Sequence, residues 1–295
     1  MTNGKPDALV PDDWPAGPMA VRMMVGAELR RLREARGITR VDAGEAIRAS
    51  HSKISRLELG RTGLKQRDVA DLLTLYGVND ETERGRWLAL AKRTTAPGWW
   101  RDFTDIMVER FDHYLGLEEA AGVIRRYEVE FVPDLLQTME YARAVFELGH
   151  DDVPPREMER RLLLLTRRQQ VLRRSRPARL WAIVDEAALR RQIDCAATMR
   201  AQLEHLIQLA AVPHITIQVM PFTAGHAVVG GPITLLRFPA RELPDVVFIE
   251  QLTSTLFLEK PADLVHYAQV MDRLGVQADP PKATVAILRK ILAET

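Results

Sequence analysis

Residues 50–61 read SHSKISRLELGR and carry the clearest structural signal of the N-terminal region. The first residue of this stretch, Ser50, can accept hydrogen bonds from the free backbone amides at the start of a helix. Ile54 and Leu57 lie three positions apart and therefore share one face of that helix. The residues on its other side are His51, Ser52, Ser55 and Arg56. The stretch predicts a helix of about eight residues with an apolar inner face and a polar, cationic outer face.

A second short helix is predicted immediately before this stretch. Thr39 can cap a helix that begins at Arg40 and ends near Arg48, with Ala43 and Ile47 facing inward. Two short helices joined by a tight turn, the second polar and positive on its outside, predict a helix-turn-helix. In that arrangement the outer face of the second helix enters the major groove of DNA.

Further helices are predicted on both sides of this pair. Apolar residues three or four positions apart predict a first helix that begins near Met19. A fourth helix is predicted over residues 64–76, and a fifth, capped by Asp80, ends near Arg93. Residues 19–93 are thus predicted to form an all-α domain of five helices.

The charge is distributed unevenly along the chain. Residues 19–67 contain 12 Lys or Arg and 5 Asp or Glu, whereas residues 68–295 contain 28 and 32. The cationic character is therefore confined to one end, as expected when only that end meets phosphates.

The five-helix region resembles the lambda-repressor and Cro type of DNA-binding domain, the Xre class, over about 70 residues. The caps at Thr39 and Ser50 and the Glu58-x-Gly60 ending fall in step with that pattern. The resemblance implies two sets of contacts to DNA. Base edges would be contacted by His51, Ser52, Ser55 and Arg56, and phosphates by Arg40, Lys53, Arg61 and Lys65.

The same resemblance implies one structural ion pair and shows two departures. Arg33 matches a first-helix arginine that pairs with the glutamate at position Glu58. Gly44 stands where the second helix backs onto the third, a position usually held by alanine, and a glycine inside a helix costs about 0.5–1 kcal/mol. Arg48 stands at a turn position where glycine is common, so a non-glycine residue would have to accept a positive φ.

The remaining N-terminal and compositional features favour an intracellular protein. Residues 1–18 are rich in proline, glycine and aspartate, lack the features of a secretory signal and are predicted to form a flexible tail. No apolar run reaches the roughly 18 residues of a membrane span. The single cysteine, Cys195, excludes an intrachain disulfide and suits a reducing cytosol. We expect a cytoplasmic protein without a metal or another cofactor.

A domain boundary is predicted at residues 94–104, where the helical pattern stops at Pro97. Trp99 and Trp100 follow this break. They could stack on a ligand, although packing between domains is the favoured alternative.

The C-terminal domain, residues 105–295, changes from a helical to a strand pattern along its length. Helices are predicted at 112–131, 134–148, 155–174, 186–191, 199–211, 263–274 and 282–293, and strands at 180–184, 214–219, 233–238, 246–249 and 255–258. The chain is therefore predicted to be α+β overall, with a five-helix lambda-repressor-like domain followed by an α+β domain that has a mainly antiparallel sheet of about five strands.

Ten stretches of the chain match one family pattern: 99–100, 118–120, 124–125, 133–138, 141–142, 168–169, 185–190, 219–221, 231–232 and 247–250. Through them the second domain resembles the effector-like domain of the actinobacterial WhiJ-like, antitoxin-like regulators. In that pattern glycine usually follows the proline that corresponds to Pro133, whereas this chain has Asp134 there. The resemblance implies a dimeric transcription factor, often encoded beside a small partner protein.

Few residues of the second domain suggest chemistry. Asp185 and Glu186 could act as acid, base or metal ligand, but they equally cap a helix. The arginine-rich segment 156–176 could bind an acidic partner or DNA, or be a solvated helix face. The loop 219–231 could be a lid or an ordinary connection. The candidate ligand or partner site comprises Trp99, Trp100, Arg168, Asp185, Glu186, Phe222, His226 and Glu250.

Three functions are compared on this basis. The favoured one is a dimeric regulator that binds a palindromic DNA operator and senses a small-molecule effector or a small partner protein. The second is an antitoxin-like interaction module that chiefly binds the small partner. The third is an enzyme with a DNA-tethering domain, but the sequence has no phosphate loop, metal cluster or nucleophile elbow, so no catalytic residue is expected.

Overall fold

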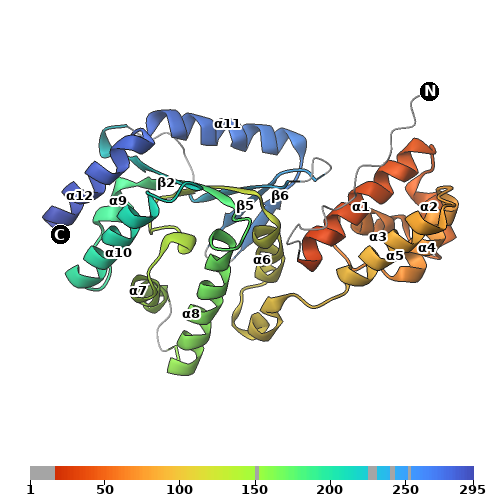
Figure 1. Cartoon of the computed structure of the whole chain (residues 1–295), viewed down its shortest axis with the longest axis horizontal. Coiled ribbons are helices and arrows are strands. Elements are labelled where there is room, and N and C mark those ends of the chain that lie inside the picture. Colours follow the sequence, from red (N-terminus) through yellow and green to blue (C-terminus); the bar gives the residue numbers. More distant parts are fainter. Residues whose placement is uncertain (1–16, 150–152, 225–230, 240–242, 252–253) are drawn as a thin grey trace. The chain divides into compact units, whose positions relative to one another are not determined.

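The computed structural model describes residues 17–149, 153–224, 231–239, 243–251 and 254–295 (Figure 1). The chain divides into two compact units that part between Arg101 and Asp102, inside the predicted linker at 94–104. The predicted tail, residues 1–18, lies outside the described residues except for its last two, and Pro18 is the first residue of a helix.

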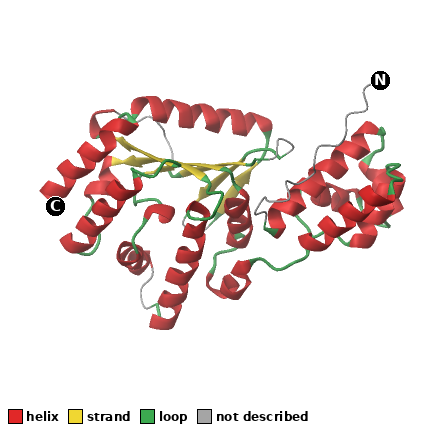
Figure 2. Cartoon of the chain, viewed as in Figure 1, coloured by secondary structure: helices red, strands yellow, loops and turns green. Residues whose placement is uncertain are grey.

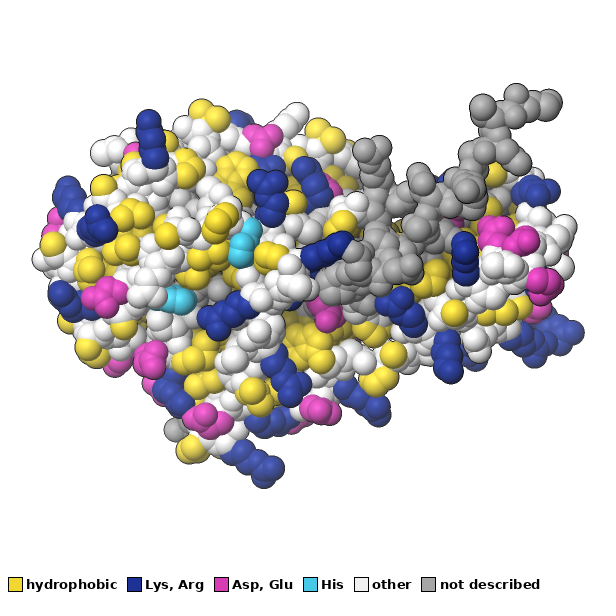
Figure 3. Space-filling model, in the orientation of Figure 1, with side chains coloured by type: hydrophobic (Ala, Val, Ile, Leu, Met, Phe, Trp, Pro, Cys, Tyr) yellow, Lys and Arg dark blue, Asp and Glu magenta, His cyan; other side chains and the backbone are white. Residues whose placement is uncertain are grey.

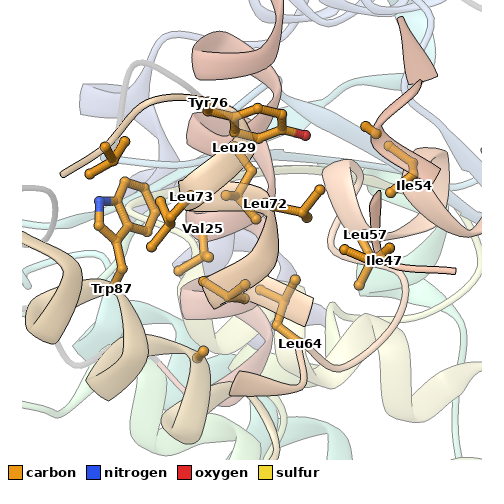
Figure 4. Close-up of a cluster of buried hydrophobic side chains, with 14 of the residues drawn as sticks. Val25, Leu29, Ile47, Ile54, Leu57, Leu64, Leu72, Leu73, Tyr76 and Trp87 are labelled. Atoms are coloured by element: carbon orange, nitrogen blue, oxygen red, sulfur yellow. The ribbon is translucent and has the colours of Figure 1, made fainter. Parts of the chain in front are cut away.

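The N-terminal unit is all-helical, as the sequence predicts, and its helices enclose one apolar core. Figure 4 shows Leu29, Ile54, Leu57 and Trp87 pointing into this core, and each of them is at most 1% exposed. A 3-10 helix, η1, follows at Trp99–Ile106. The five helices are α1 (Pro18–Ala35), α2 (Arg40–Ala46), α3 (His51–Glu58), α4 (Gln66–Leu75) and α5 (Glu81–Thr94).

The C-terminal unit is built on one six-stranded sheet, in the order β3-β2-β1-β4-β5-β6. Strands β1, β2 and β3 are parallel, whereas β1–β4, β4–β5 and β5–β6 are antiparallel pairs. The α+β class is confirmed, but the prediction of about five mainly antiparallel strands is wrong, because the sheet is mixed. The strands are β1 (Val123–Glu128), β2 (Arg179–Asp185), β3 (Ile215–Met220), β4 (Ile233–Arg237), β5 (Val246–Glu250) and β6 (Thr255–Leu258).

The strand that the sequence pattern did not reveal is β1, which falls inside the helix predicted over 112–131. Its sequence, VIRRYE, carries charged residues that argue against a buried strand, yet Arg125, Arg126 and Glu128 are all under 9% exposed. Each charge has a partner within the chain: Arg125 Nη2 lies 2.6 Å from the exposed Asp272, and Arg126 Nε lies 2.6 Å from the buried Glu128. These ion pairs allow β1 to occupy the centre of the sheet.

Helices cover both faces of the sheet (Figures 1 and 2). Helix α11 lies along one face, where it packs on Tyr127 and Ile183, and α6, α8 and α10 lie on the other. Within the described ranges, none of the helices combines the length and the apolar composition of a membrane span. The helices are α6 (Phe111–Ala120), α7 (Met139–Gly149), α8 (Pro155–Gln169), α9 (Glu186–Arg190), α10 (Ala196–Leu209), α11 (Pro261–Gln277) and α12 (Thr284–Glu294), with 3-10 turns η2 (Asp134–Leu136), η3 (Gln170–Leu172), η4 (Phe222–Ala224) and η5 (Pro281–Ala283).

Candidate functional site

Side-chain caps fix the start of both helices of the helix-turn-helix. The Thr39 hydroxyl accepts a hydrogen bond from the Asp42 amide at 3.2 Å, and the Asp42 carboxylate accepts one from the Thr39 amide at 3.1 Å. The Ser50 hydroxyl accepts one from the Lys53 amide at 3.2 Å. These bonds satisfy backbone donors that would otherwise be free, so α2 and α3 begin at defined residues.

Both departures from the Xre pattern concern the turn between α2 and α3. Arg48 has a φ of 54°, in the left-handed region, so this non-glycine residue does take the strained conformation. At Gly44, an added Cβ would lie 2.6 Å from the carbonyl oxygen of Ala49. Glycine therefore permits a closer approach of α2 to the turn than alanine would allow.

The outer face of α3 is accessible to a partner. His51, Ser52 and Arg56 are exposed and Ser55 is half-buried, whereas Ile54 on the inner face is 1% exposed. Figure 3 shows Lys and Arg side chains projecting from the surface of the N-terminal unit. The four side chains predicted to contact base edges thus lie outside the core, on one short helix.

Three of the four predicted phosphate contacts, Arg40, Arg61 and Lys65, are exposed, and Lys53 is half-buried. Arg40 and Lys53 also form ion pairs within the unit, because Arg40 Nε lies 3.0 Å from Glu58 and Lys53 Nζ lies 2.6 Å from Asp68.

Arg48 is a further candidate contact, one that the sequence pattern did not reveal. It is exposed at the turn before α3, and its side chain makes no ion pair with any described residue. Its place in the turn was visible in the sequence, but its exposure was not.

The Arg33 and Glu58 side chains pair in the interior of the N-terminal unit. Arg33 Nη2 donates to Glu58 at 3.2 Å, and the two side chains are 7% and 2% exposed. The hydrogen bond with Glu58 raises the pKa of Arg33. The pair ties the end of α3 to α1, which fixes the direction in which α3 projects its outer face.

A cluster of buried charges lies inside the C-terminal unit. Arg168 on α8 donates to both carboxylate oxygens of Glu118 on α6 at 3.0 Å, and to Asp134 at 2.9 Å. Tyr114 donates its hydroxyl to Glu118 at 2.7 Å, and Arg126 of β1 reaches Asp134 at 3.5 Å. This network joins α6, β1, η2 and α8, and we refer to these five residues as the charge cluster.

A cavity of about 380 Å³ opens beside the charge cluster. One part of its wall is apolar, and includes Val108, Phe111, Phe146 and Leu164. The polar part of its lining consists of Asp105, Asp134, Gln137, Arg161, Arg168 and Glu250.

Comparison with known proteins identifies both parts of the chain. Residues 111–290 match the family described as "Domain of unknown function (DUF5753)". The chain belongs to the DUF5753 family. Residues 25–87 match a second family, described as "Helix-turn-helix domain", which is typical of DNA-binding regulators. No curated protein and no solved structure matches the chain.

Burial and ion pairing shift the pKa values of three carboxyl groups in the DUF5753 domain. Burial raises the pKa of Glu128 to about 7, although Arg126 acts in the opposite direction. Burial also acts to raise the pKa of Asp134, but Arg126 and Arg168 outweigh it and hold that pKa at about 2. Burial, followed by the charge of Asp134, raises the pKa of Glu250. Asp134 is therefore held as an anion by its arginines. The same two arginines also act to lower the pKa of Glu250, but burial and the charge of Asp134 outweigh them.

The structure brings together only Arg168 and Glu250 from the candidate ligand or partner site, as both line the cavity. Trp99 and Trp100 belong to the N-terminal unit and pack edge to face, with ring centroids 5.7 Å apart. His226 lies outside the described residues, as does the rest of segment 225–230 of the suggested lid at 219–231.

The other candidates of the DUF5753 domain have structural partners or lie away from the cavity. The Asp185 carboxylate caps α9 by accepting the Ala187 amide at 2.9 Å. Glu186 pairs with Arg190 at 2.6 Å and accepts the amide of Phe222, whose side chain is 63% exposed. The described ranges contain no group of three or more His, Cys, Asp or Glu that could hold a metal ion.

Proposed function

We propose that this protein is a sequence-specific transcriptional regulator that reads base edges with the outer face of α3. The supporting observation is the geometry of that helix: its start is capped by Ser50, its inner face is held by Ile54 and Leu57, and its polar side is accessible. An Arg at such a position can donate two hydrogen bonds to guanine in the major groove. Arg56 is the side chain of α3 that best fits this role.

The regulator acts as a homodimer on a palindromic operator. One short recognition helix makes only a few base contacts, so two copies are needed for useful specificity. The DUF5753 domain supplies the dimer contact and the response to an effector, which matches its resemblance to WhiJ-like regulators.

The central test is a selection of duplex sites from a random pool with the full chain, followed by binding measurements on the selected site. We expect a palindrome whose half-sites lie one helical turn, or a multiple of it, apart. Arg56→Ala should reduce the preference for the selected site over a mutated one by about 5- to 150-fold, equivalent to about 1–3 kcal/mol.

The matched control is Arg86→Ala, which removes an exposed arginine on α5. It should leave the sequence preference unchanged. The proposal fails if the pool yields no preferred sequence, or if Arg56→Ala keeps the full preference. Protection of a single asymmetric half-site would contradict the dimer.

A further inference from the structure

The cavity of the DUF5753 domain has the dimensions of a small-molecule site. Its volume of about 380 Å³ falls in the range of roughly 300–1,000 Å³ that is typical of ligand pockets. Apolar side chains from four separate segments contribute to its wall: Val108 before α6, Phe111 on α6, Phe146 on α7 and Leu164 on α8. A few polar groups accompany this wall, as in sites that orient a ligand.

The arginines that line the cavity already have anionic partners. Arg168 is held by Glu118 and Asp134 at 2.9–3.0 Å. Arg161 donates to Glu157 from Nε at 3.0 Å and from Nη2 at 2.7 Å. An anionic ligand would have to compete with these carboxylates, so the site does not favour one.

Glu250 is different, because its carboxylate makes no ion pair or hydrogen bond with any residue in the described parts of the chain. Asp105 and Asp134, the other carboxylates of the lining, are paired with Arg160 and Arg168. Glu250 keeps solvent access at the cavity, although the surrounding protein removes enough water to raise its pKa. A positively charged group placed beside it would relieve that penalty.

Gln137 adds a second acceptor to the same lining. Its Nε2 donates to the carbonyl oxygen of Val132 at 2.7 Å, which fixes the orientation of the amide. Its Oε1 accepts no hydrogen bond from the residues that the structure describes. The lining therefore offers a carboxylate and an amide oxygen to a ligand that carries hydrogen-bond donors.

We propose that this cavity binds a small amphipathic cation, a molecule with one protonated amine that pairs with Glu250 and an apolar body that packs against Phe111, Phe146 and Leu164. This inference rests on the proposed function, since it names the class of effector that the regulator senses. The segment 105–108, which contributes to the cavity wall, follows directly on the linker to the DNA-binding unit. A ligand bound in the cavity would therefore alter the conformation at the C-terminal end of the linker.

The test uses three probes of equal length on the full chain: 4-phenylbutylamine, 4-phenylbutan-1-ol and 4-phenylbutanoate. Binding is measured by titration calorimetry and by the shift in Tm. We expect saturable binding of the amine, at least about tenfold tighter than that of the alcohol or the carboxylate, because a charge-assisted hydrogen bond contributes about 1.5–3 kcal/mol. Equal affinities, or tightest binding of the carboxylate, would overturn the proposal without any variant.

Variants then locate the charge that selects the amine. Glu250→Gln should lower the affinity for the amine at least about tenfold and leave that for the alcohol unchanged. Glu204→Gln, which removes an exposed carboxylate on α10 outside the cavity, should bind all three probes as the parent does. Full amine binding by Glu250→Gln would overturn the proposal.

DNA binding is measured on the same preparations, which separates this inference from the proposed function. If the protein does not bind the amine but still selects and binds its DNA site, only the proposed class of ligand is overturned. If the protein binds the amine through Glu250 but shows no sequence preference for DNA, only the proposed function as a regulator is overturned.

Discussion

Arg56 and Arg168 show the same type of side chain in two different environments, one in each unit. Arg56 is exposed on α3 and makes no ion pair with a described residue. Arg168 has a side chain 7% exposed and holds two carboxylates. An exposed, unpaired guanidinium remains available to an external partner, whereas a buried and paired one is committed to the fold. Each unit should therefore respond differently to the loss of its arginine.

The largest effect is expected from Arg168→Ala. Removing this guanidinium leaves Glu118 buried without its cation, which costs about 3–5 kcal/mol. The free energy of unfolding of the DUF5753 domain, measured in urea, should fall by that amount. Arg56→Ala should change it by no more than about 0.5 kcal/mol. Similar losses in the two variants would show that the buried and the exposed arginine contribute equally to stability.

Gly44→Ala tests whether backbone contact, rather than charge, sets the position of α3. Alanine has the higher helix propensity, but its Cβ would lie 2.6 Å from the carbonyl oxygen of Ala49. We expect a loss of about 1–3 kcal/mol in the stability of the N-terminal unit, measured by thermal unfolding. A gain in stability would show that α2 can move away from the turn at little cost.

The pH dependence of stability tests how burial affects a charged side chain of the DUF5753 domain, Glu128. Its pKa is raised from 4.5 to about 7 in the folded chain, so between these values the folded state keeps a proton that the unfolded state has released. Stability should therefore fall as the pH rises through this window. Glu128→Gln stays neutral, so its Tm should rise relative to that of the parent over the same window. If the difference in Tm between Glu128→Gln and the parent stays constant with pH, the pKa of Glu128 is not raised in the folded chain.

The smallest effect is expected from Lys65→Ala, on the exposed side. Lys65 has no ion pair among the described residues, so its loss should leave stability within about 0.5 kcal/mol of the parent. If Lys65 contacts a phosphate, the slope of log K against log salt should decrease in magnitude by about 1. Lys92→Ala, on α5, is the control and should leave the slope unchanged. An unaltered slope for Lys65→Ala would show that Lys65 does not contact a phosphate.

The sequence predicted the N-terminal unit well because its signals are local. The Thr39 and Ser50 caps, and the three- and four-residue spacing of inward positions, act within one or two helical turns. The partners of Arg40 and Lys53 were not predictable, since Asp68 belongs to α4 and Glu58 to the far end of α3. Pairing of this kind depends on how helices pack, which the local pattern does not specify.

The C-terminal unit was predicted less well because its signals are non-local. The local pattern of β1 predicts a helix, because Glu128 is the only nearby partner of its two arginines in the sequence. The other carboxylates that neutralise Arg125 and Arg126 come from α11 and η2. The cavity was found only in part, through Arg168 and Glu250, which belong to α8 and β5. Its apolar wall comes from helices whose periodicity predicts a core and not a cavity.

The mixed sheet has a consequence for the order in which the DUF5753 domain folds. Strands β4, β5 and β6 are consecutive in the chain, so their antiparallel pairing involves short loops and can form early. Strand β1 must instead find β2 and β4, pairing Val123 with Arg179 and with Arg237. Closing such long loops is slow, and until it happens the charges of β1 remain solvated. We expect β1 to join the hairpin strands late, so that the rate of refolding is limited by the docking of this single central strand.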